Sequence, residues 1–279
     1  MSPTKRGSRP AGNPAEAAGG VRADRGIAGI AGLLLILATA AVIAADAIEP
    51  EFEAMARHPH QLATSLLLRI LAAGASVGIA ISLYPVLRKS HHALATGSVV
   101  FRTIEAAMYL VGVVAALSLL PLSEQSASAS GEQRATIAVL VDSLTTVRHS
   151  AGLVAVFAFA TGALMYYWVF YRVLLVPRWL SAWGLLAGVL IFTACLLSLF
   201  QSTPVSDYIV LAAPLFLQEI VLGVWLLTKG FDSVRRIHPP SSAVGASAAV
   251  LDAAIERGAL PSAFRACASP RGMTAGIRL

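Results

Sequence analysis

An arginine and a glutamate lie three residues apart in a stretch that otherwise suits lipid, FRTIEAAMYLVGVVAALSLL at residues 101–120. Residues three apart on an α-helix point about 60° apart around its axis, so Arg102 and Glu105 share a face and can form an ion pair. A charged group at the bilayer centre costs about 2.5 kcal/mol or more unless it is paired, hydrated or able to reach the interface. We therefore expect this pair to face the protein interior.

Two further charged residues fall well inside apolar runs, and a histidine lies at the edge of another. Together they define a candidate polar centre: Arg69, Arg102, Glu105, His149 and Glu219. We expect Arg69 or Glu219 to lie close enough to join the Arg102–Glu105 pair. Such a network would be either a structural device that specifies helix packing or a hydrated pocket for a small polar or anionic ligand.

Other chemistries find less support in the residue pattern. The two histidines of HPH at residues 58–60 match no dedicated metal spacing, so we expect no metal site and no cofactor. Ser76 in GASVG has small neighbours, but no histidine within an apolar run is an evident base for it. Two cysteines, Cys195 and Cys267, cannot build a zinc site of four thiolates within one chain and are expected to be inert.

The elements that must position these residues are membrane spans. The chain has 279 residues, of which 57% are hydrophobic and 13% charged; this is about half the charged share of a soluble domain. A helix crosses a bilayer with about 20 mainly apolar residues. Six runs are long enough, at about 26–48, 61–87, 96–120, 148–172, 179–200 and 208–228. We predict an all-α membrane protein, a bundle of six transmembrane helices.

Shorter features refine this prediction. Residues 121–146 turn from polar to amphipathic and are expected to form a loop and a short interfacial helix. The aromatic cluster MYYWVFYR at residues 165–172 is typical of an interfacial belt. Glycines four apart permit close helix contacts, and we expect Gly74, Gly78, Gly184 and Gly188 to face other helices.

Three segments divide the chain. Residues 1–25 are rich in Gly, Pro, Ala and Arg and are predicted to be a disordered basic arm. Residues 26–231 form the transmembrane domain, and residues 232–279 form a mostly disordered cytoplasmic tail. AVIAADA at residues 41–47 resembles a signal-peptidase site, but the apolar run before it is longer than a signal core, so we expect the first span to be retained.

Basic residues indicate the orientation of the spans. With the N-terminus inside, the predicted cytoplasmic segments hold sixteen Lys and Arg and the external loops hold two. This asymmetry predicts that both termini are cytoplasmic in a bacterial inner membrane. Because the cations flank apolar runs rather than cover a soluble face, the expected partner is the lipid bilayer and not nucleic acid.

Five stretches together carry a resemblance to a known family. They are RILAAGASVGIAISLYPVL, FRTIEAAMYL, HSAGLVAVFAFATGALMYYWVFYR, VPRWLSAWGLLAGV and QEIVLGVWLLTKG. In order and spacing, over about residues 24–231, the chain resembles the bacterial integral-membrane family catalogued as domain of unknown function 4386 (DUF4386). The resemblance implies a membrane fold in which Arg69, Arg102, Glu105, His149, Pro177 and Glu219 are recurrent positions. It implies no established activity.

The favoured interpretation is a transporter-like or small-ligand-binding membrane module with a polar centre. One alternative is an intramembrane enzyme that uses Glu105 or Glu219 as an acid or base. Another is a structural or regulatory membrane subunit without a ligand. A transporter should have a water-accessible path to the carboxylates, an enzyme a closed pocket with a nucleophile or metal, and a structural subunit a dry, fully paired network.

Overall fold

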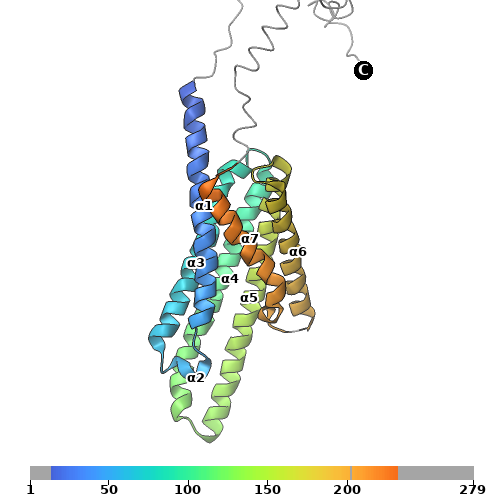
Figure 1. Ribbon diagram of the computed structural model, residues 1–279. Coiled ribbons are helices and arrows are strands. Elements are labelled where there is room, and N and C mark those ends of the chain that lie inside the picture. Colours follow the sequence, from blue (N-terminus) through green and yellow to red (C-terminus); the bar gives the residue numbers. More distant parts are fainter. Residues whose placement is uncertain (1–13, 202, 232–279) are drawn as a thin grey trace, which may run out of the picture. The chain divides into compact units, whose positions relative to one another are not determined.

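The computed structural model describes residues 14–201 and 203–231, with side chains from Arg25 onward. Within these residues the backbone forms seven α-helices and one 3₁₀ helix, and no β-strand (Figure 1). The elements are α1 (Pro14–Ile48), α2 (Phe52–Met55), α3 (Pro59–Leu87), α4 (His92–Ser128), α5 (Gly131–Val173), α6 (Arg178–Gln201), η1 (Val205–Tyr208) and α7 (Ile209–Thr228). The tail predicted at residues 232–279 and residues 1–13 of the predicted basic arm lie outside the described part of the chain.

Six helices are long and apolar enough to cross a membrane. Their spans are Arg25–Ile48, Pro59–Leu87, His92–Ser128, Gly131–Val173, Arg178–Gln201 and Val205–Thr228. Each contains an 18-residue stretch whose mean hydropathy lies between 1.8 and 2.6. The predicted fold class, an all-α protein with six transmembrane helices, is confirmed.

Backbone chemistry explains several helix ends. Pro59 starts α3, where its missing N–H has no helical partner to lose. Leu174, with φ of 60°, and Gly230, with φ of 70°, take left-handed conformations directly after α5 and close after α7. A left-handed residue stops a helix because it turns the chain away from the helix axis. After α5, the left-handed Leu174 thus allows a short connection to α6, which begins at Arg178.

The six long helices form a ring. Each packs against its neighbours in the sequence, and α7 returns to pack against α1, so the order around the ring is α1, α3, α4, α5, α6, α7 (Figure 1). Every long helix therefore has one face available for a common interior. The opposite faces carry large exposed apolar side chains, which suit lipid: Leu67, Leu71, Val114, Leu117, Leu186 and Val189 are examples.

The segment between the third and fourth spans differs from expectation. Residues 121–146 form no loop with a separate interfacial helix, because α4 continues to Ser128 and α5 begins at Gly131. Both helices run beyond the others in Figure 1. Part of the segment packs on protein: Val141 and Leu144 contact a buried cluster of Met55, Leu62, Leu66, Val113, Ala116 and Leu119. Val139 and Leu140 remain exposed.

The first helix also begins earlier than the apolar span. Residues 14–25, assigned from sequence to the basic arm, are the first turns of α1. The sequence PAEAAGGVRADR contains four alanines, the residue with the highest helix propensity. A helix that is fixed at Gly26 by its apolar span can therefore extend backwards.

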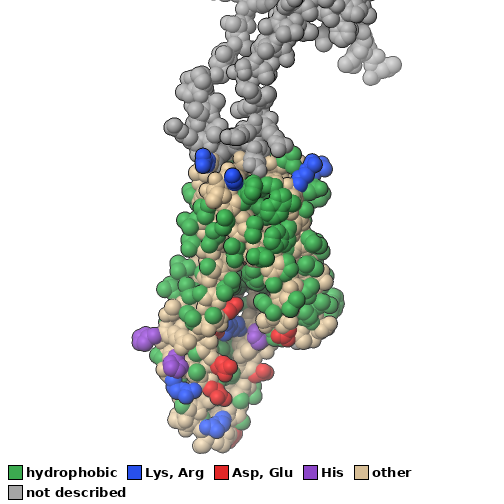
Figure 2. Space-filling model, in the orientation of Figure 1, with side chains coloured by type: hydrophobic (Ala, Val, Ile, Leu, Met, Phe, Trp, Pro, Cys, Tyr) green, Lys and Arg blue, Asp and Glu red, His purple; other side chains and the backbone are tan. Residues whose placement is uncertain are grey.

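Charge divides the bundle into two ends. At the end where α1 enters and α7 leaves, helix termini carry cations only, from Arg25 onward: Arg25, Arg88, Lys89, Arg172, Arg178 and Lys229. The opposite end carries eight acids and four arginines: Asp46, Glu49, Glu51, Glu53, Glu124, Glu132, Asp142 and Asp207, with Arg57, Arg69, Arg134 and Arg148. We call these the basic end and the acidic end. Figure 2 shows the apolar band between them.

Three of the four glycines expected at helix contacts lie at such contacts. The nearest atoms that a Cβ would meet are Leu34 Cδ1 at 3.0 Å for Gly78, Tyr167 Cδ1 at 2.6 Å for Gly184, and Leu164 Cδ2 at 2.8 Å for Gly188. Gly74 was wrongly predicted, because a Cβ there would meet no described atom within 4 Å. Gly74 thus lies on an open face of α3.

A closer glycine contact closes the ring. A Cβ on Gly32 of α1 would lie 2.6 Å from the carbonyl oxygen of Gly223 on α7, and a Cβ on Gly223 would lie 2.9 Å from the carbonyl oxygen of Gly32. Real Cβ atoms do not approach backbone oxygens this closely. The first and last spans therefore meet at a distance that only glycine allows.

We predict that Gly32→Val destabilises the bundle by about 1–3 kcal/mol, because the added side chain would force α1 and α7 apart. The measurement is the free energy of unfolding in detergent. Gly29→Val is the matched control, since it lies one turn away on α1 and a Cβ there would meet nothing within 4 Å among the described residues. Equal stability of the two variants would contradict a packed glycine contact.

Candidate functional site

The predicted ion pair is present at the centre of the bundle. Arg102 Nη1 lies 3.1 Å from Glu105 Oε2, and the two side chains are 2% and 5% exposed. Both residues lie on the inner face of α4, three positions apart, as the helical period requires. Neither group reaches water by extending along the helix, so both depend on protein partners.

Glu219 of α7 joins the pair from across the ring. Arg102 Nη2 lies 3.5 Å from Glu219 Oε1. Thr39 Oγ1 of α1 donates a hydrogen bond to Glu219 Oε2 at 3.0 Å. The carboxylate therefore links the first, third and last spans.

Two hydroxyl groups complete the contacts of the guanidinium. Ser76 Oγ on α3 donates to Glu105 Oε2 at 2.8 Å and accepts from Arg102 Nη1 at 3.1 Å. Tyr166 Oη on α5 accepts from Arg102 Nη2 at 2.9 Å. The ring of Phe159 lies 4.4 Å from the guanidinium carbon, within the range of a cation–π contact. We call Thr39, Ser76, Arg102, Glu105, Tyr166 and Glu219 the central cluster.

The central cluster is unbalanced in charge. It holds one guanidinium and two carboxyl groups, so its formal charge is −1 when both carboxyls are ionised. Arg102 Nε has no hydrogen-bond partner among the described residues, although its side chain is 2% exposed. Net charge in a low-dielectric interior is costly unless a further positive charge neutralises it.

A small cavity adjoins the central cluster. Its volume is about 60 Å³, whereas one water molecule needs about 10–15 Å³ of such space. All six long helices line it: Ala38, Thr39 and Val42 from α1; Ala72, Ser76 and Ile79 from α3; Arg102, Glu105 and Tyr109 from α4; Val156 and Phe159 from α5; Ile191 from α6; Phe216 and Glu219 from α7. The cavity has room for a few waters or one small ion beside the carboxylates.

Arg69 does not join the central cluster. Its Nη2 lies 2.5 Å from Asp46 Oδ1 and 2.7 Å from Glu49 Oε2, and Arg148 Nη1 pairs with Glu49 Oε1. Of the two expected partners of the Arg102–Glu105 pair, only Glu219 is in contact with it. Arg69 lies instead beside the end of the antiparallel α1, whose last acids reach it. These four residues form a neutral network at the acidic end.

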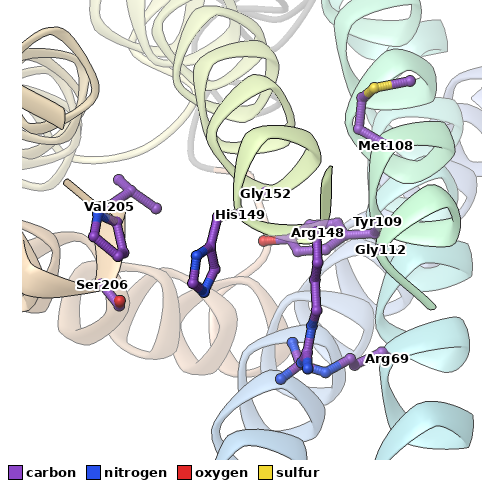
Figure 3. Close-up of a pocket in the computed structure, with 10 residues that line it drawn as sticks. Arg69, Met108, Tyr109, Gly112, Arg148, His149, Gly152, Val205 and Ser206 are labelled. Atoms are coloured by element: carbon purple, nitrogen blue, oxygen red, sulfur yellow. The ribbon is translucent and has the colours of Figure 1, made fainter. Parts of the chain in front are cut away.

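An outer cleft of about 310 Å³ opens beside this network. Arg69, Met108, Tyr109, Gly112, Arg148, His149, Gly152, Pro204, Val205 and Ser206 line it. In Figure 3 the guanidinium groups of Arg69 and Arg148 lie side by side, and His149 lies between α5 and the segment that carries Ser206. The structure therefore places His149 in the outer cleft and not in the central cluster.

A group of aromatic side chains fills the bundle on the other side of the central cluster. Tyr166, Tyr167 and Phe170 are at most 1% exposed, and Phe231 packs on Phe170 with ring centroids 6.3 Å apart. The rings of Tyr166 and Tyr167 are 4.4 Å apart, and Tyr167 Oη donates to Gln218 Oε1. We call these four rings the aromatic plug, because they occupy the interior between the central cluster and the basic end.

The interfacial belt predicted at residues 165–172 is only partly correct. Trp168 and Tyr171 are 47% and 38% exposed, whereas Tyr166, Tyr167 and Phe170 face inward. Sequence reasoning read this segment as one cluster of aromatics. The helical period of the segment could have separated the two groups, because positions 166, 167 and 170 share one face of a helix.

In the part of the chain that the structure describes, no three His, Cys, Asp or Glu side chains gather where they could hold a metal ion. The central cluster itself offers guanidinium, carboxyl and hydroxyl groups. Proton transfer and ion binding are within the reach of such groups.

Comparison with protein families matches residues 27–230 to a family described as Domain of unknown function (DUF4386). No curated protein and no solved structure matches the chain. The matched residues include all of the central cluster and the outer cleft.

The network at the acidic end makes a prediction about pH. Burial of the Glu49 carboxyl raises its pKa, but the neighbouring Arg148 and Arg69 guanidinium groups outweigh burial, and the pKa lies below its ordinary value. A lowered pKa in the folded state adds stability that is present above the unfolded value of about 4.3 and is lost as pH falls through the folded value. We predict that Glu49→Gln removes this acid-sensitive part of the stability.

The measurement is the melting temperature in detergent between pH 7 and the acid limit of folding. Wild type should lose more stability below about pH 4.3 than Glu49→Gln. Glu51→Gln, at an exposed position two residues away, is the control and should follow wild type. Parallel acid profiles for wild type and Glu49→Gln would show that Glu49 is not stabilised by its arginines.

Proposed function

Since the chain belongs to the family described as Domain of unknown function (DUF4386), we propose a function from the site itself: the central cluster binds a proton or one small monovalent cation in the middle of the membrane. The observation that carries this proposal is the surplus carboxyl group. Glu105 and Glu219 both contact the single guanidinium of Arg102, and a cavity lies beside them. One added positive charge balances the cluster.

The geometry favours a cation over the anionic ligand considered from sequence. Both terminal nitrogens of Arg102 already donate hydrogen bonds, Nη1 to Ser76 and Glu105 and Nη2 to Tyr166. Only the Nε–H of Arg102 is left for an anion, and an anion would add negative charge to an already negative site. A proton or a small cation meets oxygen ligands without displacing any contact.

The surroundings of the central cluster support a transporter-like role. Towards the acidic end, the outer cleft approaches the cluster; towards the basic end, the aromatic plug fills the interior. An ion site near the bilayer midplane with a cleft on one side and a packed interior on the other is expected of one state in alternating access. A multi-pass protein of this kind would move the bound charge between the two ends.

The enzyme alternative is less well supported. Ser76 Oγ lies 2.8 Å from Glu105, as a nucleophile and its base would. The same oxygen accepts a hydrogen bond from Arg102, which withdraws electron density from it. The structural alternative, a membrane subunit without a ligand, is supported by the many paired groups in the central cluster. The experiment below distinguishes it from ion binding.

We propose that the acidic end is external and the basic end cytoplasmic, in a bacterial inner membrane. The support is the charge division of the bundle, since positively charged residues are retained on the cytoplasmic side. In this orientation the outer cleft faces the outside.

The ion-binding proposal predicts a specific stabilisation. The melting temperature of the purified full chain is measured in LiCl, NaCl, KCl and NH₄Cl at constant ionic strength, with N-methylglucamine as the bulky reference cation, and from pH 5 to 8. A ligand at 100 times its Kd adds about 2.7 kcal/mol of stability. Wild type should gain stability from one small cation or from protons, and Glu219→Gln should abolish that gain.

Glu53→Gln, at an exposed position of the acidic end, is the control and should keep the response. An identical response in wild type and Glu219→Gln would refute the site. A structural network gives a different result: no cation or proton response, together with a loss of about 3–5 kcal/mol in Glu105→Gln, because a buried arginine loses its partner.

The orientation predicts thiol labelling in intact cells. In a chain with Cys195→Ala and Cys267→Ala, Glu53→Cys should react with a membrane-impermeant maleimide added outside. Ser90→Cys, in the exposed connection between α3 and α4, should react only after permeabilisation. Labelling of Ser90→Cys from outside would invert the topology.

A further inference from the structure

The outer cleft and the central cavity share one lining side chain. Tyr109 lines both spaces. It lies four residues after Glu105 on α4, hence on the same helix face and one turn nearer the acidic end. Figure 3 shows its ring at the wall of the outer cleft, behind Arg148.

Two glycines keep the outer cleft open. A Cβ at Gly152 of α5 would meet no described atom within 4 Å, and a Cβ at Gly112 of α4 would meet only Arg148 Cγ, at 4.0 Å. Both positions line the cleft. A side chain at either position would occupy the space through which a solute approaches Tyr109.

The charges around the outer cleft suit the passage of a cation. Arg69 and Arg148 would repel it if their charges were free, but Asp46 and Glu49 pair with them. Glu49 bridges the two guanidinium groups, and the four formal charges cancel. The cleft is thus nearly neutral, and the net negative charge lies further in, at the central cluster.

We infer that the outer cleft is the access route to the central cluster and that the Tyr109 side chain is its gate. A small hydrated cation enters between Gly112 and Gly152, passes the Tyr109 ring and reaches Glu105 and Glu219. The aromatic plug closes the route beyond them. This inference rests on the proposed ion site for its cargo, but the route itself can be tested without that site.

The test uses a reporter thiol in the central cavity. Ala72 lines the cavity on α3, is 6% exposed and makes no side-chain hydrogen bond, so Ala72→Cys adds only a sulfur atom. The background carries Cys195→Ala and Cys267→Ala. The probe is Ag⁺, a small cation that blocks thiols, in chloride-free buffer on the full chain in detergent. The rate of blocking is read by alkylating the remaining thiol after denaturation.

Two variants change the route in opposite directions. Gly152→Phe should slow the Ag⁺ reaction at least tenfold, because its ring fills the outer cleft. Tyr109→Ala should accelerate it at least tenfold, because the gate is removed. Gly74→Phe is the control for the added ring, since Gly74 has no described neighbour within 4 Å of a Cβ and lines neither space. It should react at the wild-type rate.

Unchanged rates in both Gly152→Phe and Tyr109→Ala would overturn the route. Should Gly152→Phe fail to fold, Gly152→Leu provides a smaller obstruction and Tyr109→Ala remains decisive by itself. The reaction of the thiol does not require Glu219. If the route exists but the ion site does not, the Ag⁺ rates follow these expectations while the salt-dependent stability of wild type equals that of Glu219→Gln.

Discussion

A guanidinium group in the middle of a bilayer must keep its hydrogen-bond partners, and Arg102 draws its partners from α3, α5 and α7 as well as from α4. No pair of neighbouring helices can supply these groups. The ring arrangement follows from this need, because it turns one face of every long helix towards the same point. The packing of the helices and the hydrogen bonding of the central cluster therefore depend on each other.

The contact between α1 and α7 shows how packing serves the site. Gly32 and Gly223 allow the two backbones to touch. Thr39, two turns further along α1, then reaches Glu219. A bulkier contact would separate the helices and leave the carboxylate without its threonine. The glycine contact thus decides the hydrogen bonding of Glu219, although Thr39 lies about 10 Å along α1 from Gly32, at 1.5 Å of helix rise per residue.

The spans and the Arg102–Glu105 pair are predictable from sequence, because hydropathy and helical period are local properties. The partners of Arg69 are not, since depth in a helix places Arg69 near the membrane centre but does not reveal that α1 ends beside it with Asp46 and Glu49. Thr39 gives no signal, because a threonine in a membrane helix more often bonds its own backbone. Tyr166 was hidden among aromatics that face lipid. The missing information is the order of helices around the ring, which no local pattern encodes.

Closure of the ring by its first and last members has a consequence for synthesis. Thr39 and Glu219 are 180 residues apart, and the chain leaves the ribosome with α1 first and α7 last. Before α7 is inserted, Arg102 and Glu105 are already in the membrane. The central cluster then lacks the helix that covers one side of it and the carboxylate of Glu219. The nascent five-span intermediate is balanced in charge at its centre, one arginine against one glutamate, and is open on the side where α7 will lie. Insertion of the last helix both completes the ring and adds the second carboxyl group, so the proposed ion site would be complete only when α7 has been inserted.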